Sequence, residues 1–187
     1  MKKVILAGHA VTANILRCYL ENDPRYQVIA STVDDDFLSQ DSGGTVGLSS
    51  LLALYPPSDH VIMMAMGYHA LNQSRESMFY RLKEMGYTIE TYIHKDAKVY
   101  TKNPVGEGSV ILPSAVVEPY VDIGMNTMVW ANVTLAHHSS IASHCWIASG
   151  AVISGFAKIA RNCFIGVNAT IVNNLSIGEY GVIGAGA

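Results

Sequence analysis

The stretch IASHCWIASGAVISGFAKIARNCFIGVNATI, residues 141–171, carries an isoleucine at every sixth position. The same period extends in both directions from Ile93 to Ile183, and every position in it holds isoleucine, valine or leucine. These positions are Ile93, Val99, Val105, Ile111, Val117, Ile123, Val129, Leu135, Ile141, Ile147, Ile153, Ile159, Ile165, Ile171, Ile177 and Ile183. Four places after each aliphatic residue the side chain is mostly small, as at Ala151 and Ala157. Neither an α-helix nor an alternating strand has this period, which is the signature of a solenoid built from hexapeptides.

Three hexapeptides make one eighteen-residue coil of a triangular parallel β-helix. We expect the aliphatic residues to point inward and the small residues to pack near the corners, because the interior volume is fixed. The unbroken period leaves no room for a long loop, so we expect smooth faces and clefts only against the N-terminal domain or another subunit. A flat-sided prism favours self-association, and a symmetric homotrimer is the predicted state. The last hexapeptide stops at its fifth residue without a cap, so we expect further coils or a cap after Ala187.

The first 92 residues read as alternating strands and helices. The expected strands are 3–8, 27–33, 60–66 and 88–92, and the expected helices are 9–21, 48–54 and 71–85. A loop containing Gly43 and Gly44 precedes the second helix. This order predicts a small Rossmann-like α/β domain with a parallel sheet over residues 1–92, followed by the β-solenoid over 93–187.

Ligands of parallel sheets bind where the strands end, which here means Gly8-His9, Asp34-Asp35 and Gly67-Tyr68. The pattern G-x-G-x-x-G is absent after the first strand, so a dinucleotide is not predicted. A smaller nucleotide could place a phosphate on the amides that open the helix at His9. Gly8 is equally explained as a tight turn into that helix. Asn72 and Arg75, after the third strand, are either ligands or solvated surface residues.

Composition limits the partners and the compartment. The net charge is −3 and no run of Lys or Arg occurs, so neither nucleic acid nor an anionic membrane surface is a predicted partner. No apolar run is long enough to span a bilayer. Cys145 and Cys163 lie one coil apart at small inward positions and are expected to be core thiols, and Cys18 is the third cysteine. These features predict a cytoplasmic protein.

Residues eighteen apart stack on the same corner of such a solenoid, which places His137 and His138 one coil before Gly155. Adjacent coils lie roughly 4.8 Å apart, so a backbone N–H comes within reach of a carbonyl held beside His137. A base next to an amide donor is the arrangement that acyl transfer needs. The alternatives are a solvated histidine pair and a metal site. Zinc needs three or more converging ligands, and His144 belongs to the next corner, so no metal is predicted.

The whole chain resembles a bacterial family that joins a nucleotide-sugar-binding α/β domain to a left-handed β-helix and transfers acetyl groups from acetyl-CoA. The family includes sialic-acid O-acetyltransferases and the N-acetyltransferases of UDP- or dTDP-linked amino sugars. The likeness rests on the hexapeptide repeat and on the segment Ala136-His137-His138-Ser139-Ser140-Ile141. It has the spacing of the family's Asn-His-Asp/Glu triplet ahead of an inward isoleucine, which implies that His137 is the general base. His138 replaces the acidic residue, so either His138 is itself the base or another group orients His137.

The resemblance also implies the ligand-binding residues. For acetyl-CoA it implies a contact of the thioester oxygen with the Gly155 amide, a pantetheine arm near Val167 and Ala185 at an edge facing a neighbouring subunit, and further contacts at His144 and Trp146. For the nucleotide sugar it implies Gly8, His9, Asp34 or Asp35, Gly67, Tyr68 and Arg75. Only Gly8-His9 remains of the family's glycine-rich turn in the first domain.

The predicted function is therefore acetyl-CoA-dependent acetylation of a nucleotide-linked amino sugar in glycan biosynthesis, by direct attack and without a covalent enzyme intermediate. N-acetylation is favoured over O-acetylation. Two functions of other classes remain as alternatives, a metal-dependent hydratase on the same scaffold and a non-catalytic trimeric binding module.

Overall fold

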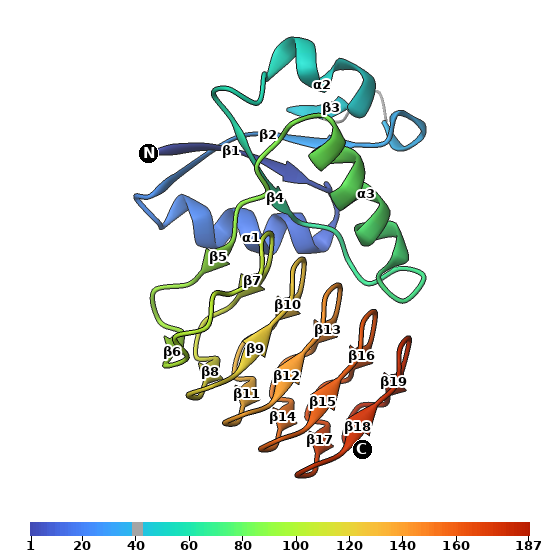
Figure 1. Ribbon diagram of the computed structural model, residues 1–187. Helices are drawn as coiled ribbons and strands as arrows, with labels where there is room; N and C mark the ends of the chain where they lie inside the picture. Colours follow the sequence, from blue (N-terminus) through green and yellow to red (C-terminus); the bar gives the residue numbers. More distant parts are fainter. Residues whose placement is uncertain (39–42) are drawn as a thin grey trace. The chain divides into compact units, whose positions relative to one another are not determined.

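The computed structural model describes residues 1–38 and 43–187. The chain forms two compact units, which are coloured in sequence order in Figure 1. The first unit contains Met1–Gly67 and Ser77–Glu90, and the second contains Tyr68–Glu76 and Thr91–Ala187. The continuous part of the second unit therefore begins at Thr91. This unit also includes a short earlier segment, Tyr68–Glu76, which the sequence predicts in the first domain.

The first unit is built on a parallel sheet with strand order β3-β2-β1-β4. Its strands are β1 (Lys2–Ala7), β2 (Tyr26–Val33), β3 (Thr45–Gly47) and β4 (Val61–Met64). This confirms the predicted α/β fold. The short strand β3 lies where a loop was expected, because it is only three residues long and ends in glycine.

The strand predicted at 88–92 is not a strand of this sheet in the part of the chain described. Ile89 makes a single parallel bridge to Ile62, after which Tyr92–Ile93 form strand β5 in the second unit. Tyr92 and Ile93 pair there with Val110 and Ile111. The prediction was wrong because the apolar run 88–92 is divided between two structures.

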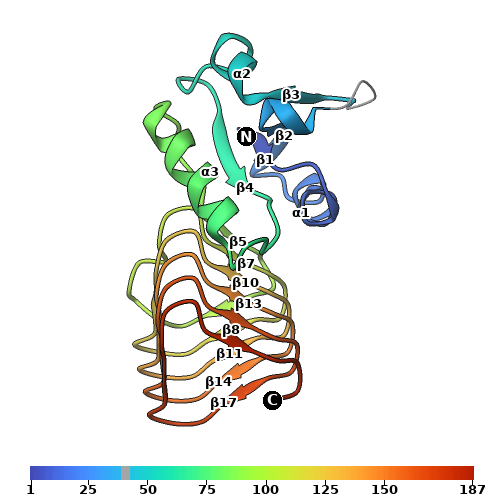
Figure 2. The same ribbon diagram turned by 90° about the vertical axis from the view of Figure 1, so that its right-hand side faces the viewer.

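Helices cover both faces of the sheet. Helix α1 (Val11–Glu21) buries Ala13, Leu16 and Leu20. Helix α2 (Leu48–Leu54) and the part of α3 (Gln73–Glu84) from Ser77 onward share one core with the alternate residues of β1 and β4. Figure 2 shows α1 and α3 on opposite sides of β4. A short 3₁₀ turn, η1 (Asp35–Phe37), follows β2.

The second unit is the left-handed parallel β-helix that the sixfold period predicts. Its strands are β5 (Tyr92–Ile93), β6 (Lys98–Val99), β7 (Val110–Ile111), β8 (Val116–Val117), β9 (Asp122–Ile123), β10 (Met128–Val129), β11 (Thr134–Leu135), β12 (Ser140–Ile141), β13 (Trp146–Ile147), β14 (Val152–Ile153), β15 (Lys158–Ile159), β16 (Phe164–Ile165), β17 (Thr170–Ile171), β18 (Ser176–Ile177) and β19 (Val182–Ile183). They form three parallel sheets, and each strand pairs with the one eighteen residues later, as Met128 does with Trp146. The stacked coils are visible in Figures 1 and 2.

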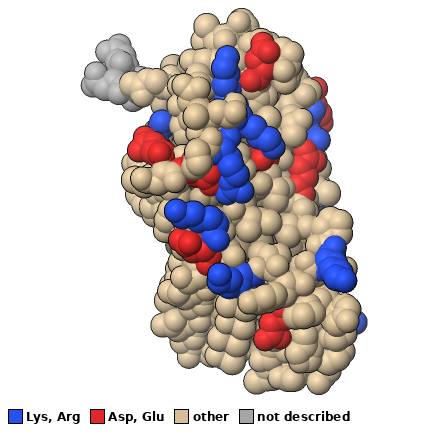
Figure 3. Space-filling model, turned by 90° about the vertical axis from the view of Figure 1, so that its left-hand side faces the viewer, with Lys and Arg blue, Asp and Glu red and all other residues tan. Residues whose placement is uncertain are grey.

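All sixteen periodic aliphatic residues lie in or against one core of the β-helix, as predicted. Cys145 and Cys163 are buried in it as free thiols, and Cys18 is exposed. No helix in the described ranges is both long and apolar enough to cross a bilayer. On the face shown in Figure 3, Lys and Arg lie among Asp and Glu instead of forming one continuous basic patch.

The corners of the β-helix follow a second period that the sequence analysis did not use. Three residues before every inward aliphatic from Ile111 to Ile183, and again at Gly186, the backbone has positive φ. These positions are Gly108, Ser114, Tyr120, Asn126, Asn132, His138, His144, Gly150, Phe156, Asn162, Asn168, Asn174, Tyr180 and Gly186. Glycine and asparagine tolerate this conformation best, which explains why they occupy most of these places.

Candidate active site

His137 and His138 lie on an exposed corner between β11 and β12. The same corner carries Tyr120 one coil earlier, and Gly155 and Phe156 one coil later. We call these five residues the histidine corner. Both histidine side chains are exposed, as predicted for an outward-pointing turn.

The His137 ring lies directly against Gly155. A Cβ atom at position 155 would come within 2.8 Å of Cε1, 3.2 Å of Nε2 and 3.3 Å of Nδ1 of this ring. The stacking predicted from the eighteen-residue repeat is therefore confirmed as geometry. Only glycine lets the imidazole lie this close to the backbone.

The Gly155 N–H is an unused donor, since it has no acceptor within residues 1–38 and 43–187. One coil earlier, the equivalent N–H of His137 donates to Oε2 of Glu118 at 2.7 Å. On this corner the His137 amide thus already binds one carboxylate oxygen. By the repeat, the Gly155 amide is presented in a similar way and is suited to bind another.

The two histidines also interact through their rings. Nδ1 of His137 lies 3.2 Å from Nδ1 of His138. The His138 ring stacks on Phe156, with centroids 4.8 Å apart, and lies 4.7 Å from the Tyr120 ring. Glu118, Tyr120 and Phe156 were missed from the sequence, although positions 120, 138 and 156 are related by the same eighteen-residue step that identified Gly155.

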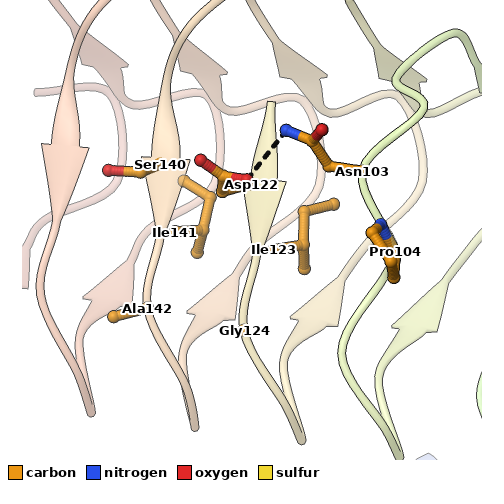
Figure 4. Close-up of a pocket in the computed structure, with 8 residues that line it drawn as sticks. All are labelled: Asn103, Pro104, Asp122, Ile123, Gly124, Ser140, Ile141 and Ala142. Carbon is orange, nitrogen blue, oxygen red and sulfur yellow. Dashed lines mark hydrogen bonds between the residues drawn. The ribbon is translucent and has the colours of Figure 1, made fainter. Parts of the chain in front are cut away.

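A shallow hollow of about 520 Å³ lies over strands β9 and β12, and β12 begins two residues after His138. Figure 4 shows it with the hydrogen bond from Asn103 Nδ2 to Asp122 Oδ1, at 2.8 Å. It is lined by Asn103, Pro104, Asp122, Ile123, Gly124, Ser140, Ile141 and Ala142. The faces are thus not uniformly smooth, because small residues such as Gly124, Ser140 and Ala142 leave a depression on the β-helix itself.

His144 and Trp146 do not belong to the histidine corner. Both are buried, with 2% and 5% of their surface exposed. Nδ1 of His144 lies 2.9 Å from the Asn126 amide, and the Trp146 ring packs between Trp130 and Tyr68. This burial is inconsistent with the predicted contact of the two side chains with acetyl-CoA.

Arg75 also has a structural place. Nη1 donates to the carbonyl of Asn126 at 2.6 Å, and Nη2 donates to the carbonyl of Cys145 at 3.1 Å and to Oδ1 of Asn72 at 3.2 Å. The side chain is only 1% exposed, so it does not present the ligand-binding surface that the resemblance implied. Asn72, likewise buried, donates to the carbonyl of Cys163 at 3.2 Å. The two residues fasten the segment Tyr68–Glu76 to the β-helix.

Val167 and Ala185 are exposed, as a pantetheine contact requires, but they are on a different corner from His137. The hydrogen bond from the Gly186 N–H to the Val167 carbonyl, at 2.8 Å, links the two coils there. Within one chain they are not brought together with Gly155. Their predicted role stays a prediction that depends on a neighbouring subunit.

In the first unit, Gly8 stands at the carboxyl end of β1. Its φ is 126°, and a Cβ there would meet the carbonyl of Ala65 at 2.6 Å, so the turn itself requires glycine. Strand order changes direction between β1 and β4, which makes this edge the switch point where ligands of such sheets bind. His9 and Gly67 are exposed at the same edge.

The structure distinguishes the two predicted aspartates. Asp35 accepts hydrogen bonds from the N–H of Ser49, at 3.1 Å, and from its hydroxyl, at 2.6 Å, and thereby caps helix α2. The side-chain hydrogen bond from Ser49 is the main cause that lowers the pKa of Asp35. Asp34 is partly exposed and forms an ion pair with Arg81. Asp34 is therefore the better candidate for a ligand contact.

In the described ranges, no group of three or more His, Cys, Asp or Glu side chains is arranged to hold a metal ion.

Because His144 is buried, we expect the free energy of unfolding to fall in mild acid. Burial, opposed by Glu76 and reinforced by Arg75 and Arg161, lowers the pKa of His144 from 6.5 to about 4. The unfolded chain then binds more protons than the folded chain between these two values, so stability falls as the pH drops through this window. We expect this residue to remove about 2 kcal/mol of the free energy of unfolding between pH 7 and pH 5.

Urea unfolding of the wild type and of His144→Asn at the two pH values measures this effect. Asparagine occupies the equivalent turn position at Asn126 and Asn162, so the variant keeps the backbone conformation. The pH dependence should be smaller in His144→Asn than in the wild type by about this amount. Equal pH dependence in both proteins would contradict the assignment.

No protein-family model and no curated protein matches the chain. Several solved structures share its fold over almost its entire length. The acetyltransferase domain of PglB from Neisseria gonorrhoeae FA1090, in complex with acetyl coenzyme A, is 24% identical with a TM-score of 0.86, over 99% of this chain and 89% of that one.

Two further structures match similarly. A variant of perosamine N-acetyltransferase from Caulobacter crescentus, in complex with CoA and GDP-perosamine, is 19% identical with a TM-score of 0.86, over 100% of this chain and 87% of that one. WeeI from Acinetobacter baumannii AYE is 22% identical with a TM-score of 0.80, over 100% and 90%. The chain therefore has the fold of these proteins, an α/β unit combined with a left-handed β-helix.

Proposed function

We propose that the protein is an acetyl-CoA-dependent N-acetyltransferase acting on a nucleotide-linked amino sugar. The observation that carries the proposal is the His137 imidazole held against Gly155, whose N–H has no acceptor in the described part of the chain. The fold supports it, since it is shared with the PglB domain that binds acetyl coenzyme A and with perosamine N-acetyltransferase bound to CoA and GDP-perosamine.

In this reaction His137 transfers the proton and Gly155 stabilises the negative charge. The amine of the sugar attacks the thioester carbonyl, and a C–N bond forms while Nε2 of His137 takes the proton that the nitrogen loses. The Gly155 N–H donates to the oxyanion of the tetrahedral intermediate. When the C–S bond breaks, His137 returns its proton to the departing thiolate, so the enzyme ends in its starting state. No covalent enzyme intermediate is involved.

The nucleotide sugar and acetyl-CoA need further contacts besides His137 and Gly155. We assign the nucleotide sugar to the edge of the first sheet, with Gly8, His9, Asp34 and Gly67. UDP, dTDP and GDP are the candidate nucleotides, the last because of the perosamine enzyme. Free thiols are consistent with a cytoplasmic location, where thiols stay reduced.

The pantetheine arm of acetyl-CoA is assigned to Val167 and Ala185 of a neighbouring subunit in a homotrimer. Apolar side chains exposed on the last coils, such as Val172 and Val182, support an interface between subunits. Light scattering after size exclusion should give three times the mass of one chain. A monomer at working concentrations would remove this part of the proposal.

The proposal is tested by incubating the purified protein with acetyl-CoA and a panel of UDP-, dTDP- and GDP-linked sugars, each with either an amino or a hydroxyl group at the variable position. Mass spectrometry should show one added acetyl group on an amino sugar. Transfer only to the hydroxyl sugars would replace N-acetylation by O-acetylation. If no sugar is acetylated and acetyl-CoA does not bind, the protein is a binding module instead.

Gly155→Ala should damage catalysis without damaging the fold. The added methyl would press on the exposed His137 ring at 2.8–3.3 Å, and this ring can swing away. The φ of Gly155 lies outside the left-handed region, so alanine fits the backbone. Because misplacing a reacting group by about 1 Å costs on the order of 10²-fold, we expect kcat/KM to fall by roughly a hundredfold.

Gly178→Ala is the matched control, because a Cβ there meets no atom within 4 Å. Its φ also lies outside the left-handed region, so alanine fits the backbone. It should keep wild-type kcat/KM, and both variants should unfold at nearly the wild-type urea concentration. Wild-type activity in Gly155→Ala would show that the packing of His137 on Gly155 is irrelevant to turnover.

A further inference from the structure

In the contact between the rings of His137 and His138, the tautomer of each ring decides which one donates the hydrogen bond. Nδ1 of His137 and Nδ1 of His138 lie 3.2 Å apart and share one hydrogen, so one ring donates and the other accepts. A neutral imidazole has one N–H and one lone pair. If His138 donated, His137 would carry its own hydrogen on Nε2 and could not take a proton there. The direction of this hydrogen bond therefore decides whether His137 is a base.

The base role proposed for His137 requires a lone pair on Nε2. The ring lies against Gly155, and the Gly155 N–H has no acceptor in residues 1–38 and 43–187. The base must take the proton of the amine at Nε2, which faces away from His138 in the ring. The hydrogen of a neutral His137 is then on Nδ1, which lies 3.2 Å from Nδ1 of His138 and can donate to it.

The His138 ring is held in place by aromatic rings on both neighbouring coils. Its ring centroid lies 4.7 Å from that of Tyr120 and 4.8 Å from that of Phe156. These distances equal the spacing of adjacent coils, about 4.8 Å, so the stack follows from the repeat. The φ angles of Tyr120, His138 and Phe156 are 67°, 60° and 60°. Bulky residues rarely adopt this conformation, and at the other two corners most equivalent positions hold Asn or Gly.

We propose that His138 is a positioning residue, clamped between Tyr120 and Phe156, whose Nδ1 accepts the Nδ1–H of His137 and so keeps Nε2 of His137 free to take a proton. The proposal rests on the proposed function for its catalytic consequence. When His137 takes the proton of the amine, its Nδ1–H becomes a stronger donor to His138. The faces of Tyr120 and Phe156 stabilise the positive charge that His138 then shares. The proton leaves from Nε2 to the thiolate, so atoms and charge balance.

Two variants separate the acceptor from the stack. His138→Phe keeps a ring between Tyr120 and Phe156 but has no acceptor, and Phe156 shows that phenylalanine fits this turn with φ of 60°. His138→Asp removes the ring but keeps an acceptor, and aspartate tolerates positive φ. We expect kcat of His138→Phe to fall roughly a hundredfold at unchanged KM, because most of His137 leaves the productive tautomer. His138→Asp should keep kcat within about tenfold of the wild type. An active Phe variant with an impaired Asp variant would show a purely structural stack and overturn the proposal.

A nitrogen-15 NMR measurement tests the tautomer without any turnover. At a pH where the rings are neutral, wild-type His137 should show a protonated Nδ1 and an unprotonated Nε2, with its signals assigned by their loss in His137→Asn. In His138→Phe the hydrogen should move mainly to Nε2. A wild-type hydrogen on Nε2, or an unchanged tautomer in His138→Phe, overturns the proposal. If the protein acetylates no sugar but shows these tautomers, the proposed function fails and the positioning of His137 stands.

Discussion

His137→Asn should lower kcat by a factor of about 10² to 10⁴, the usual contribution of a general base. Asparagine keeps a polar side chain near Gly155 but cannot take a proton from the amine. The thioester would still be held by the Gly155 amide, so KM for acetyl-CoA should change little. The measurement is steady-state kinetics with the amino sugar identified in the panel.

The fold should survive this change, because the His137 ring is exposed and its contacts are the Gly155 backbone, His138 and the edge of Phe156. His60→Asn is a matched control, since His60 lies in the first unit and bonds to the carbonyl of Pro56 at 3.0 Å. The control should keep wild-type kcat. A His137→Asn variant that retains more than a tenth of the wild-type kcat would exclude His137 as the base.

Arg75→Leu should lower the free energy of unfolding by about 3 kcal/mol or more. Burial lowers the pKa of Arg75 to about 10, so the guanidinium is still charged at neutral pH and is stabilised by the oxygens of Asn126, Cys145 and Asn72. Leucine would leave the Asn126 carbonyl without its donor in a buried place. Urea unfolding gives the total loss, and hydrogen exchange at Tyr68–Glu76 shows whether this segment opens first.

Arg161→Leu is the control for this prediction. Arg161 contacts the same segment, with Nη2 2.6 Å from Oε1 of Glu76, but its side chain is 42% exposed. An exposed ion pair contributes about 1 kcal/mol or less, so the control should be nearly as stable as the wild type. If Arg75→Leu were no less stable than Arg161→Leu, the buried hydrogen bonds of Arg75 would not hold the segment.

The β-helix was predictable because its six-residue period is compatible with only one register of the inward aliphatic residues. Each inward aliphatic from Ile111 to Ile171 is buried, and a slip of one residue would turn the whole row to the outside. The same period located Gly155 beside His137, because stacking on a corner follows from counting eighteen residues. The aromatic partners of His138 obey the same count, and the sequence would have shown them had the corner positions been compared.

The segment Tyr68–Glu76 could not be placed from the sequence. Its anchors, Arg75 and Asn72, are polar and therefore read as surface or ligand-binding residues. In the structure they bind main-chain carbonyls of Asn126, Cys145 and Cys163, and carbonyls carry no signal in the sequence. His144 was misassigned because the segment that buries it could not be placed, although its partner Asn126 lies eighteen residues earlier on the same corner. Strand β3 was missed because three residues give too little pattern.

The position of a bound thioester tests the central claim most directly. A crystal structure with acetyl-CoA, or with an analogue in which the sulfur is replaced so that it cannot react, should place the thioester oxygen about 2.7–3.1 Å from the Gly155 nitrogen. Nε2 of His137 should face the side from which an amine approaches the carbonyl carbon. An acetyl group bound at another corner, with the Gly155 amide free, would contradict the account.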